Sequence, residues 1–259
     1  MRRRISRLLF LASVVLAHTA GAAPNVEIAP HRAVFLVSLA EPNSVLSSAR
    51  GLAAIELGRT CDGWRYRQRY ELETMPVNGE SNRIAFTLDG RENLDRQTYA
   101  FRSSSDYGGG EPQQLIGRAE LTTDGGVVRY TEPVATEKAL PKGTGFVVGA
   151  MRIAIIAALE GKKSVSTPWF TGSTPEEPLL VSSIILPIDA KDTGQPLLRG
   201  KRWRFLSAFF TDPDQPTPAY EGEETLLENG VLAEATYRYD GYALKLELQR
   251  LEPLPLPDC

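Results

Sequence analysis

Polar and apolar residues alternate along most of the chain, and short turn motifs separate the alternating runs. In segment 226–252, for example, an alternating run turns at an Asp-Gly dipeptide and returns with Leu244, Leu246 and Leu248 on one face. Dipeptides of this kind, Asn-Gly or Asp-Gly, begin at Asn78, Asn229, Asp62, Asp89, Asp124 and Asp240. Because they supply the positive φ of tight turns at little cost, they predict β-hairpins.

Similar alternating runs occupy much of the remaining sequence, at 31–39, 50–58, 64–73, 82–89, 97–103, 114–122, 179–188, 201–210 and 220–228. Successive side chains on a strand point to opposite faces, so each run is expected to bury one face. About a dozen strands thus follow one another without helical spacers, a pattern that predicts a mainly β protein with one large antiparallel barrel or sandwich.

One helix is predicted to interrupt the strands. Thr144 is a candidate N-cap, an apolar run from Phe146 to Leu159 follows it, and Gly161 with two lysines marks the end. The run is apolar nearly all round but shorter than a membrane-spanning helix, so we expect it to be buried. The predicted architecture is therefore a single open antiparallel barrel of about a dozen or more strands, with one buried helix packed into or across it.

The N-terminus has the pattern of a secretory signal peptide over residues 1–22: four arginines, an apolar stretch from Leu8 to Ala17, and the small-x-small site Ala20-Gly21-Ala22. Cleavage after Ala22 leaves residues 23–259 as one exported domain, which we place in the periplasm. The leader carries 4 of the 29 basic residues and none of the 32 acidic ones, so the mature net charge is −7. An acidic chain of this kind is not expected to bind nucleic acid.

The two cysteines of the chain are Cys61 and Cys259, the last residue. In an oxidising compartment an even pair of thiols is most simply a disulfide, and two cysteines allow one pairing. The predicted bridge closes a loop of roughly 200 residues and contributes at most about 5 kcal/mol in the chain-entropy model. It would tie the C-terminus to an early strand.

Candidate catalytic groups are scarce. After cleavage His31 is the one remaining histidine, and no motif for nucleophilic catalysis surrounds it. No group of cysteine, histidine and acidic residues has the spacing of metal ligands. We therefore expect no catalytic site, no metal and no cofactor.

The segment "WRYRQRYE" is the strongest candidate for a binding surface. Alternation places three aromatic residues on one face and three arginines on the other, namely Trp64, Tyr66 and Tyr70 against Arg65, Arg67 and Arg69. These can be a core face and a solvated face. They can also be an aromatic lining and an arginine ladder that holds anionic glycans or lipid phosphates of the cell envelope.

The order of several motifs resembles the cell envelope integrity protein EipB family of Gram-negative bacteria. The matching pieces are "HRAVFLVSL", "ARGLAAIEL", "CDGWRYRQRYELE", "GRAEL", "LPKGTGF" before a helix, "LLENGV" and "LQRLEPLPLPDC". The resemblance implies a non-enzymatic periplasmic protein folded as a β-spiral or open barrel, with a Cys61–Cys259 disulfide and a role in envelope integrity under stress. The chain departs from the family pattern at 147–150 and 171–178.

Two binding functions follow as expectations. The first is a monomeric scaffold for envelope homeostasis that interacts with an envelope component or a periplasmic protein, by resemblance a tetratricopeptide-repeat protein. The second is a carrier, similar in outline to the lipoprotein carriers LolA and LolB, that holds a lipid or an acyl chain in a half-open barrel. A hydrolase is the least favoured class, given the scarcity of catalytic groups.

Overall fold

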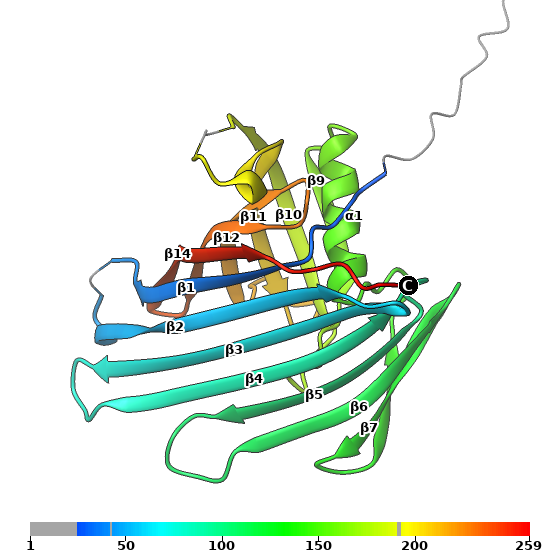
Figure 1. Ribbon diagram of the computed structural model, residues 1–259. Coiled ribbons are helices and arrows are strands. Elements are labelled where there is room, and N and C mark those ends of the chain that lie inside the picture. Colours follow the sequence, from blue (N-terminus) through cyan, green and yellow to red (C-terminus); the bar gives the residue numbers. More distant parts are fainter. Residues whose placement is uncertain (1–24, 42, 191–192) are drawn as a thin grey trace, which may run out of the picture.

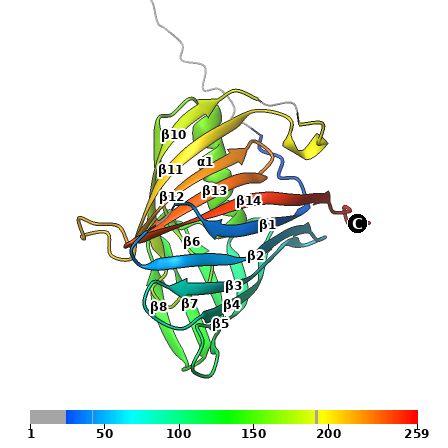
Figure 2. The ribbon, with the colours of Figure 1, turned by 90° about the vertical axis from the view of Figure 1, so that its left-hand side faces the viewer.

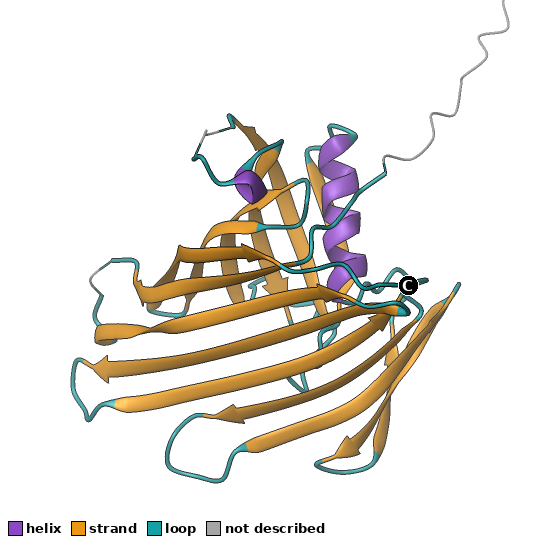
Figure 3. Cartoon of the chain, viewed as in Figure 1, coloured by secondary structure: helices purple, strands orange, loops and turns teal. Residues whose placement is uncertain are grey.

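A computed structural model describes residues 25–41, 43–190 and 193–259 of the chain (Figure 1). The predicted signal peptide, residues 1–22, lies outside the described residues. Within these described residues, fourteen strands form one antiparallel sheet and a single long helix accompanies it (Figure 3). The fold prediction is confirmed, because the protein is mainly β and its antiparallel sheet is not closed edge to edge.

The strands follow one another as a meander in two halves. The first half consists of β1 (His31–Leu39), β2 (Leu46–Arg59), β3 (Gly63–Pro76), β4 (Asn82–Asn93), β5 (Thr98–Asp106), β6 (Gln113–Thr122), β7 (Gly125–Glu132) and β8 (Thr136–Leu140). After the helix α1 (Val147–Leu159), the second half consists of β9 (Ser164–Trp169), β10 (Leu179–Ile188), β11 (Arg202–Phe210), β12 (Tyr220–Leu227), β13 (Leu232–Tyr239) and β14 (Tyr242–Pro253), with a short 3-10 helix, η1 (Pro196–Leu198), before β11.

Pairing between β1 and β14 joins the two halves, so that the edge strands are β8 and β9. The sheet curls (Figures 1 and 2), and α1 connects β8 to β9, the two edge strands, in the chain. One bridge closes part of the seam: the Gly145 N–H donates to the Pro168 carbonyl at 2.9 Å, and the Phe170 N–H donates to the Gly145 carbonyl at 3.0 Å. The Lys138 ammonium on β8 donates to carbonyls of the loop after β9.

Five of the six predicted turns lie between strands, but the sixth is wrong. Asp89 and Gly90 lie within β4, where Gly90 pairs with Phe101. A Cβ atom at Gly90 would lie 2.0 Å from the Tyr99 hydroxyl oxygen. The glycine is therefore needed for the close approach of a fully buried tyrosine ring, and not for a turn.

Three strands were not predicted, namely β7, β8 and β9. The sequences of β8 and β9 explain why these two strands carry a weak signal. The strand β8 reads "TEKAL", with one β-branched and no aromatic residue, and β9 reads "SVSTPW", which contains a proline. They occupy the two edges of the sheet, where proline and charged residues are tolerated.

The helix begins one residue after the predicted apolar start, with Phe146 as its N-cap. The predicted N-cap, Thr144, is wrong, because its hydroxyl donates to the Pro141 carbonyl at 2.7 Å. The first helical N–H groups are instead satisfied by Glu92 of β4, whose carboxylate accepts hydrogen bonds from Val148 N at 2.7 Å and Gly149 N at 2.8 Å. An acidic group is favoured there by the partial positive charge at the helix N-terminus.

The helix is packed between apolar clusters from both halves of the sheet. Val148 and Ile155 lie against Leu57 and against Val26 and Ile28 before β1. Ala157 and Ala158 lie against a cluster from β10 and β11 that includes Trp203. The prediction of one buried helix is confirmed for these sides, while Ile153 is 37% exposed.

The predicted disulfide is present. Cys61 and Cys259 are bonded, with Cα atoms 5.8 Å apart and a sequence separation of 198. Cys61 lies in the β2–β3 turn, beside which Figure 1 marks the C-terminus. The Leu254 N–H also donates to the Pro30 carbonyl at 2.9 Å, so the tail is held at two points.

Candidate functional site

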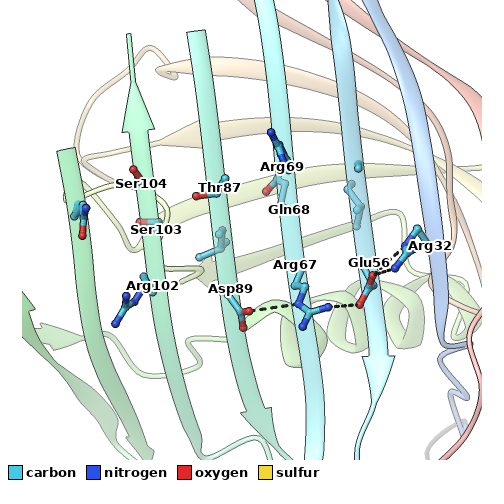
Figure 4. Close-up of a pocket in the computed structure, with 14 residues that line it drawn as sticks. Arg32, Glu56, Arg67, Gln68, Arg69, Thr87, Asp89, Arg102, Ser103 and Ser104 are labelled. Atoms are coloured by element: carbon cyan, nitrogen blue, oxygen red, sulfur yellow. Dashed lines mark hydrogen bonds and ion pairs between the residues drawn. The ribbon is translucent and has the colours of Figure 1, made fainter. Parts of the chain in front are cut away.

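The arginines of β3 point to the outer face of the sheet, as alternation predicts. Arg65 and Arg67 both contact the Asp89 carboxylate of β4. Arg67 Nη1 also donates to Glu56 Oε1 of β2 at 2.9 Å. Glu56 in turn accepts from Arg32 of β1 at 2.5 Å, so alternating charges cross four strands (Figure 4).

This charge ladder lowers the pKa of its acidic members. Partial burial alone would raise the pKa of Glu56, but hydrogen bonds and charge from Arg32 and Arg67 hold that pKa below its usual value. The same balance lowers the pKa of Asp89, where burial is outweighed by Arg65 and Arg67. Both carboxylates are therefore ionised at neutral pH, and they neutralise part of the arginine charge.

The ladder forms one side of a groove of about 660 Å³ on the outer face. Its lining combines the charges with hydroxyl and amide groups from neighbouring strands. The residues are Arg32, Ala54, Ile55, Glu56, Arg67, Gln68, Arg69, Thr87, Leu88, Asp89, Arg102, Ser103, Ser104 and Gln114. Figure 4 shows Arg102 on β5 at the far side of Asp89 from Arg67. A groove of this kind offers many hydrogen-bond donors to a polar, anionic ligand.

Arg102 differs from the other arginines of the groove. It is exposed, and across the described parts of the chain no acidic group lies within ion-pair distance of it. Arg69 is partly neutralised by Glu71, which it contacts at 2.5 Å. Arg102 is therefore the member of the groove with a guanidinium free to bind an added anion.

The aromatic residues of β3 are separated along the inner face. Trp64 and Tyr66 pack against the cluster around Val148 and Ile155 of α1. Tyr70 lies further along the strand and stacks on Phe86 with ring centroids 5.0 Å apart. The structure thus places two of these residues in the helix-packed core and the third beside a different group of tyrosines. A binding role for this strand stays a prediction.

A second candidate surface was not predicted as a site: a set of tyrosines on the inner face of the second half. Tyr220 of β12 stacks on Tyr239 of β13 at 5.4 Å, and Tyr239 stacks on Tyr242 of β14 at 5.1 Å. Tyr70 of β3 belongs to the same group, because, in addition to burial, Tyr239 and Tyr242 raise the pKa of Tyr70 and Tyr70 raises the pKa of Tyr220. We call Tyr70, Tyr220, Tyr237, Tyr239 and Tyr242 the tyrosine wall. The sequence signal was the alternation at 232–248, which identified the strands but not their aromatic cluster.

The tyrosine wall is only partly covered. Tyr239 is 36% exposed, and the other four have intermediate exposure. Leu244, Leu246 and Leu248 of β14 point to the same face and are also partly exposed. Burial raises the pKa of Tyr70, and the neighbouring tyrosines raise it further. The wall is therefore apolar enough to disfavour charge on a phenol, yet it is accessible to solvent.

Segment 171–178, one of the two departures from the family pattern, folds around a buried carboxylate. Glu177 accepts hydrogen bonds from the N–H groups of Thr171 and Gly172 at 2.7 and 2.6 Å, and from the hydroxyl of Ser173 at 2.7 Å. The Tyr99 hydroxyl donates to the Thr171 carbonyl at 2.8 Å. The loop is thus fixed inside the curl of the sheet and serves packing.

A family model described as EipB-like matches residues 22–255. The chain belongs to the EipB-like family. Among solved structures, the chain is similar to a β-barrel-like protein of a domain of unknown function from Brucella abortus, with 21% identity, a TM-score of 0.81, and coverage of 89% of this chain and 100% of that chain. That likeness shows the fold of this EipB-like protein. No curated protein matches the chain.

Two further findings concern the described part of this EipB-like chain. It contains no helix with the length and apolar character needed to cross a membrane. It also contains no group of three or more histidine, cysteine or acidic residues arranged to hold a metal ion. The Cys61–Cys259 disulfide fits a location outside the cytoplasm, where such bonds persist.

Proposed function

We propose that this protein is a non-enzymatic, monomeric periplasmic scaffold that maintains the cell envelope by binding an anionic envelope component. The observation that carries the proposal is the outer groove, where Arg102 presents a guanidinium without an acidic partner among the described residues. The paired strands and the disulfide hold this face in a fixed geometry, so ligand binding requires little loss of conformational entropy at the site. By family resemblance, the protein partner is a tetratricopeptide-repeat protein.

The scarcity of catalytic groups supports a role in binding. His31 is the single histidine among the described residues, and it is 3% exposed. Its Nδ1 lies 2.7 Å from the Ala29 carbonyl oxygen, and burial lowers the pKa of the imidazole. A histidine in this position contributes to packing at the start of β1.

The test compares two exposed arginines of the outer face. Arg102→Gln removes the charge that lies in the groove, whereas Arg91→Gln removes a similar exposed charge from β4 outside the groove. Binding of a delipidated, phosphorylated core oligosaccharide is measured by calorimetry at low and high salt. We expect Arg102→Gln to weaken binding about tenfold or more and Arg91→Gln to change it little.

The same variants are introduced into a strain that lacks the gene and is exposed to envelope stress. The proposal expects Arg91→Gln to restore resistance and a folded Arg102→Gln protein to restore it poorly. Full rescue by Arg102→Gln, together with unchanged binding, would show that the groove is ordinary solvated surface.

A second candidate function is a carrier for a lipid or an acyl chain. The observation that favours it is the partial exposure of the tyrosine wall and of the leucines of β14 on the inner face. Apolar side chains that face inward but remain accessible can cover a ligand chain. Native mass spectrometry of the protein purified from its own envelope separates the candidates: a bound lipid supports the carrier, and an empty protein with a co-purifying partner supports the scaffold.

A further inference from the structure

A line of polar groups crosses the inner face of the second half of the sheet. The hydroxyls of Ser183 on β10 and Ser207 on β11 are 2.9 Å apart. Ser207 Oγ lies 3.4 Å from Glu224 Oε2 on β12, and the Tyr237 hydroxyl on β13 donates to Glu224 Oε1 at 2.7 Å. Polar atoms of four adjacent strands thus form one line, and two of them, from Ser207 and Tyr237, contact the Glu224 carboxylate.

The surroundings of Glu224 are otherwise apolar. Its cross-strand neighbours are Phe205 and Ala235, both buried. Burial raises the pKa of Glu224, while the hydrogen bonds from Tyr237 and Ser207 act in the opposite direction. Glu224 nevertheless keeps intermediate exposure as a residue.

Glu224 has no cationic partner within the described residues. The basic residues of these strands lie on the outer face, where Arg204 pairs with Glu223 at 3.2 Å. A carboxylate in an apolar setting is costly unless a counter-charge accompanies it. In the protein without a ligand, burial favours the neutral acid, and a bound cation would supply the counter-charge that stabilises the carboxylate.

Aromatic rings lie beside this carboxylate because the neighbouring position is a glycine. A Cβ atom at Gly222 would lie 3.0 Å from Phe209 and 3.2 Å from Tyr237, so both rings extend across the glycine. Tyr220 stacks on Phe209 at 4.3 Å and meets Tyr237 edge to face at 6.3 Å. Ring faces and a carboxylate together are the groups that bind an organic ammonium ion.

We propose that Glu224 and Tyr237 bind the ammonium group of an amphiphile whose apolar chain lies along the leucines of β14. The cross-strand neighbours of Tyr237 and Ala235 on β14 are Leu244 and Leu246, which are partly exposed on the same face. The head group and the chain would thus contact adjacent rows of one surface. This inference rests on the carrier function and adds the chemistry of the ligand to it.

The probes are decyltrimethylammonium and decyl sulfate, used below their micelle-forming concentrations, and choline as the head group without a chain. Binding is measured by calorimetry for the full mature chain and for Glu224→Gln. The matched control is Glu221→Gln, which removes an exposed carboxylate from the outer face of the same strand. Thermal unfolding confirms that each variant is folded.

We expect wild-type protein to bind decyltrimethylammonium at least tenfold more tightly than decyl sulfate, and choline weakly. Glu224→Gln should lower affinity for the cationic probe at least tenfold and leave decyl sulfate unchanged, while Glu221→Gln should behave as wild type. Equal binding of the cationic probe by Glu224→Gln and wild type would overturn the inference. If both decyl probes bind equally, the carrier function stands and the ammonium site is wrong; if neither binds, both are wrong.

A second measurement needs no variant. A carbodiimide with a small amine labels accessible carboxyl groups, and tandem mass spectrometry reads the labelling of each carboxyl group. Decyltrimethylammonium should slow the labelling of Glu224 at least threefold and leave that of Glu221 unchanged. Labelling of Glu224 at the same rate with and without the probe would contradict the site, even if Glu224→Gln fails to fold.

Discussion

The inner face of one sheet is used in two different ways. Around α1 it is a closed core, where Phe146, Tyr99 and Phe170 are fully buried and their rings contact one another. On β12 to β14 it is open, and Tyr239 in the tyrosine wall is 36% exposed. Both regions consist of antiparallel strands with the same alternation. The difference arises because the chain places a helix and a folded loop against the first region.

The two regions are expected to serve different purposes: the core around α1 stabilises the fold, and the tyrosine wall is a candidate binding surface. The closed core is densely packed, so the removal of a methylene group from it lowers the free energy of unfolding. The open region keeps apolar and aromatic surface accessible, and such surface is the usual basis of ligand binding. We therefore expect substitutions around α1 to affect stability first and substitutions in the tyrosine wall to affect binding first.

The largest effect on the free energy of unfolding is expected when one aliphatic side chain from each region is truncated and the two losses are compared. Ile155→Ala in α1 should lower the free energy of unfolding by about 4 kcal/mol, because the residue is fully buried and leaves a cavity. Leu246→Ala on β14 should lower it by about 1 kcal/mol, because its side chain is already partly exposed. Urea unfolding measures both values. Equal losses would mean that the two regions are packed alike.

The disulfide is expected to have the next largest effect. Cys259→Ser should lower the free energy of unfolding by about 3 kcal/mol, since the bond restricts the unfolded chain. Thermal unfolding of the variant should match that of wild-type protein in reductant. Peptide maps of the exported protein with and without reductant check the bond itself, and two free thiols there would contradict the structure.

Glu92 should make the closed core sensitive to pH. Burial raises its pKa from 4.5 to about 7, against the smaller effect of the N–H groups of Val148 and Gly149. A carboxyl group with a higher pKa in the folded state binds its proton more tightly there, so stability falls as pH rises from about 4.5 to about 7. From pH 5 to pH 7, wild type should lose about 2 kcal/mol relative to Glu92→Gln. A constant difference between the two proteins would show that Glu92 does not titrate in this range.

The smallest expected effect concerns Gly90. Gly90→Ala would place a methyl group against the Tyr99 ring and should cost about 1–2 kcal/mol. Gly58→Ala on β2 is the matched control, because the nearest atoms to its Cβ lie 3.9 Å away, and it should cost little. The double variant Gly90→Ala with Tyr99→Phe should recover part of the loss. A loss as small as that of the control would mean that the Tyr99 ring moves freely.

Sequence periodicity was sufficient for the fold but not for the details of the closed core. Alternation located β1 and β10 at their observed bounds because buried residues recur on one face along most of each strand. It could not show that Gly90 faces a tyrosine, or that Glu92 replaces Thr144 at the helix N-terminus, since both depend on contacts between distant segments. Hydrophobic periodicity indicates the helix or strand to which a residue belongs, but it does not indicate which distant residue that side chain contacts.

The candidate surfaces were predicted only in part from the sequence. The outward arginines of β3 followed from alternation, but their carboxylate partners on β2 and β4 depend on strand register. The tyrosine wall was missed because Tyr70 of β3 is distant in sequence from the other four tyrosines, and because the contacts among those four depend on the register of β12, β13 and β14. Glu224 carried no signal of its own within "YEGEETLLE".

Hydroxyl-radical footprinting tests the contrast between the two regions most directly, because oxidation of a side chain follows its exposure to solvent. The native, disulfide-bonded protein is exposed to a short radical pulse, and mass spectrometry gives the oxidation rate of each peptide. Peptides with Tyr237, Tyr239 and Leu246 should be oxidised at least several-fold faster, relative to the unfolded chain, than those with Phe146 and Phe170. Equal protection of the two sets would contradict the open inner face and the binding function proposed for it.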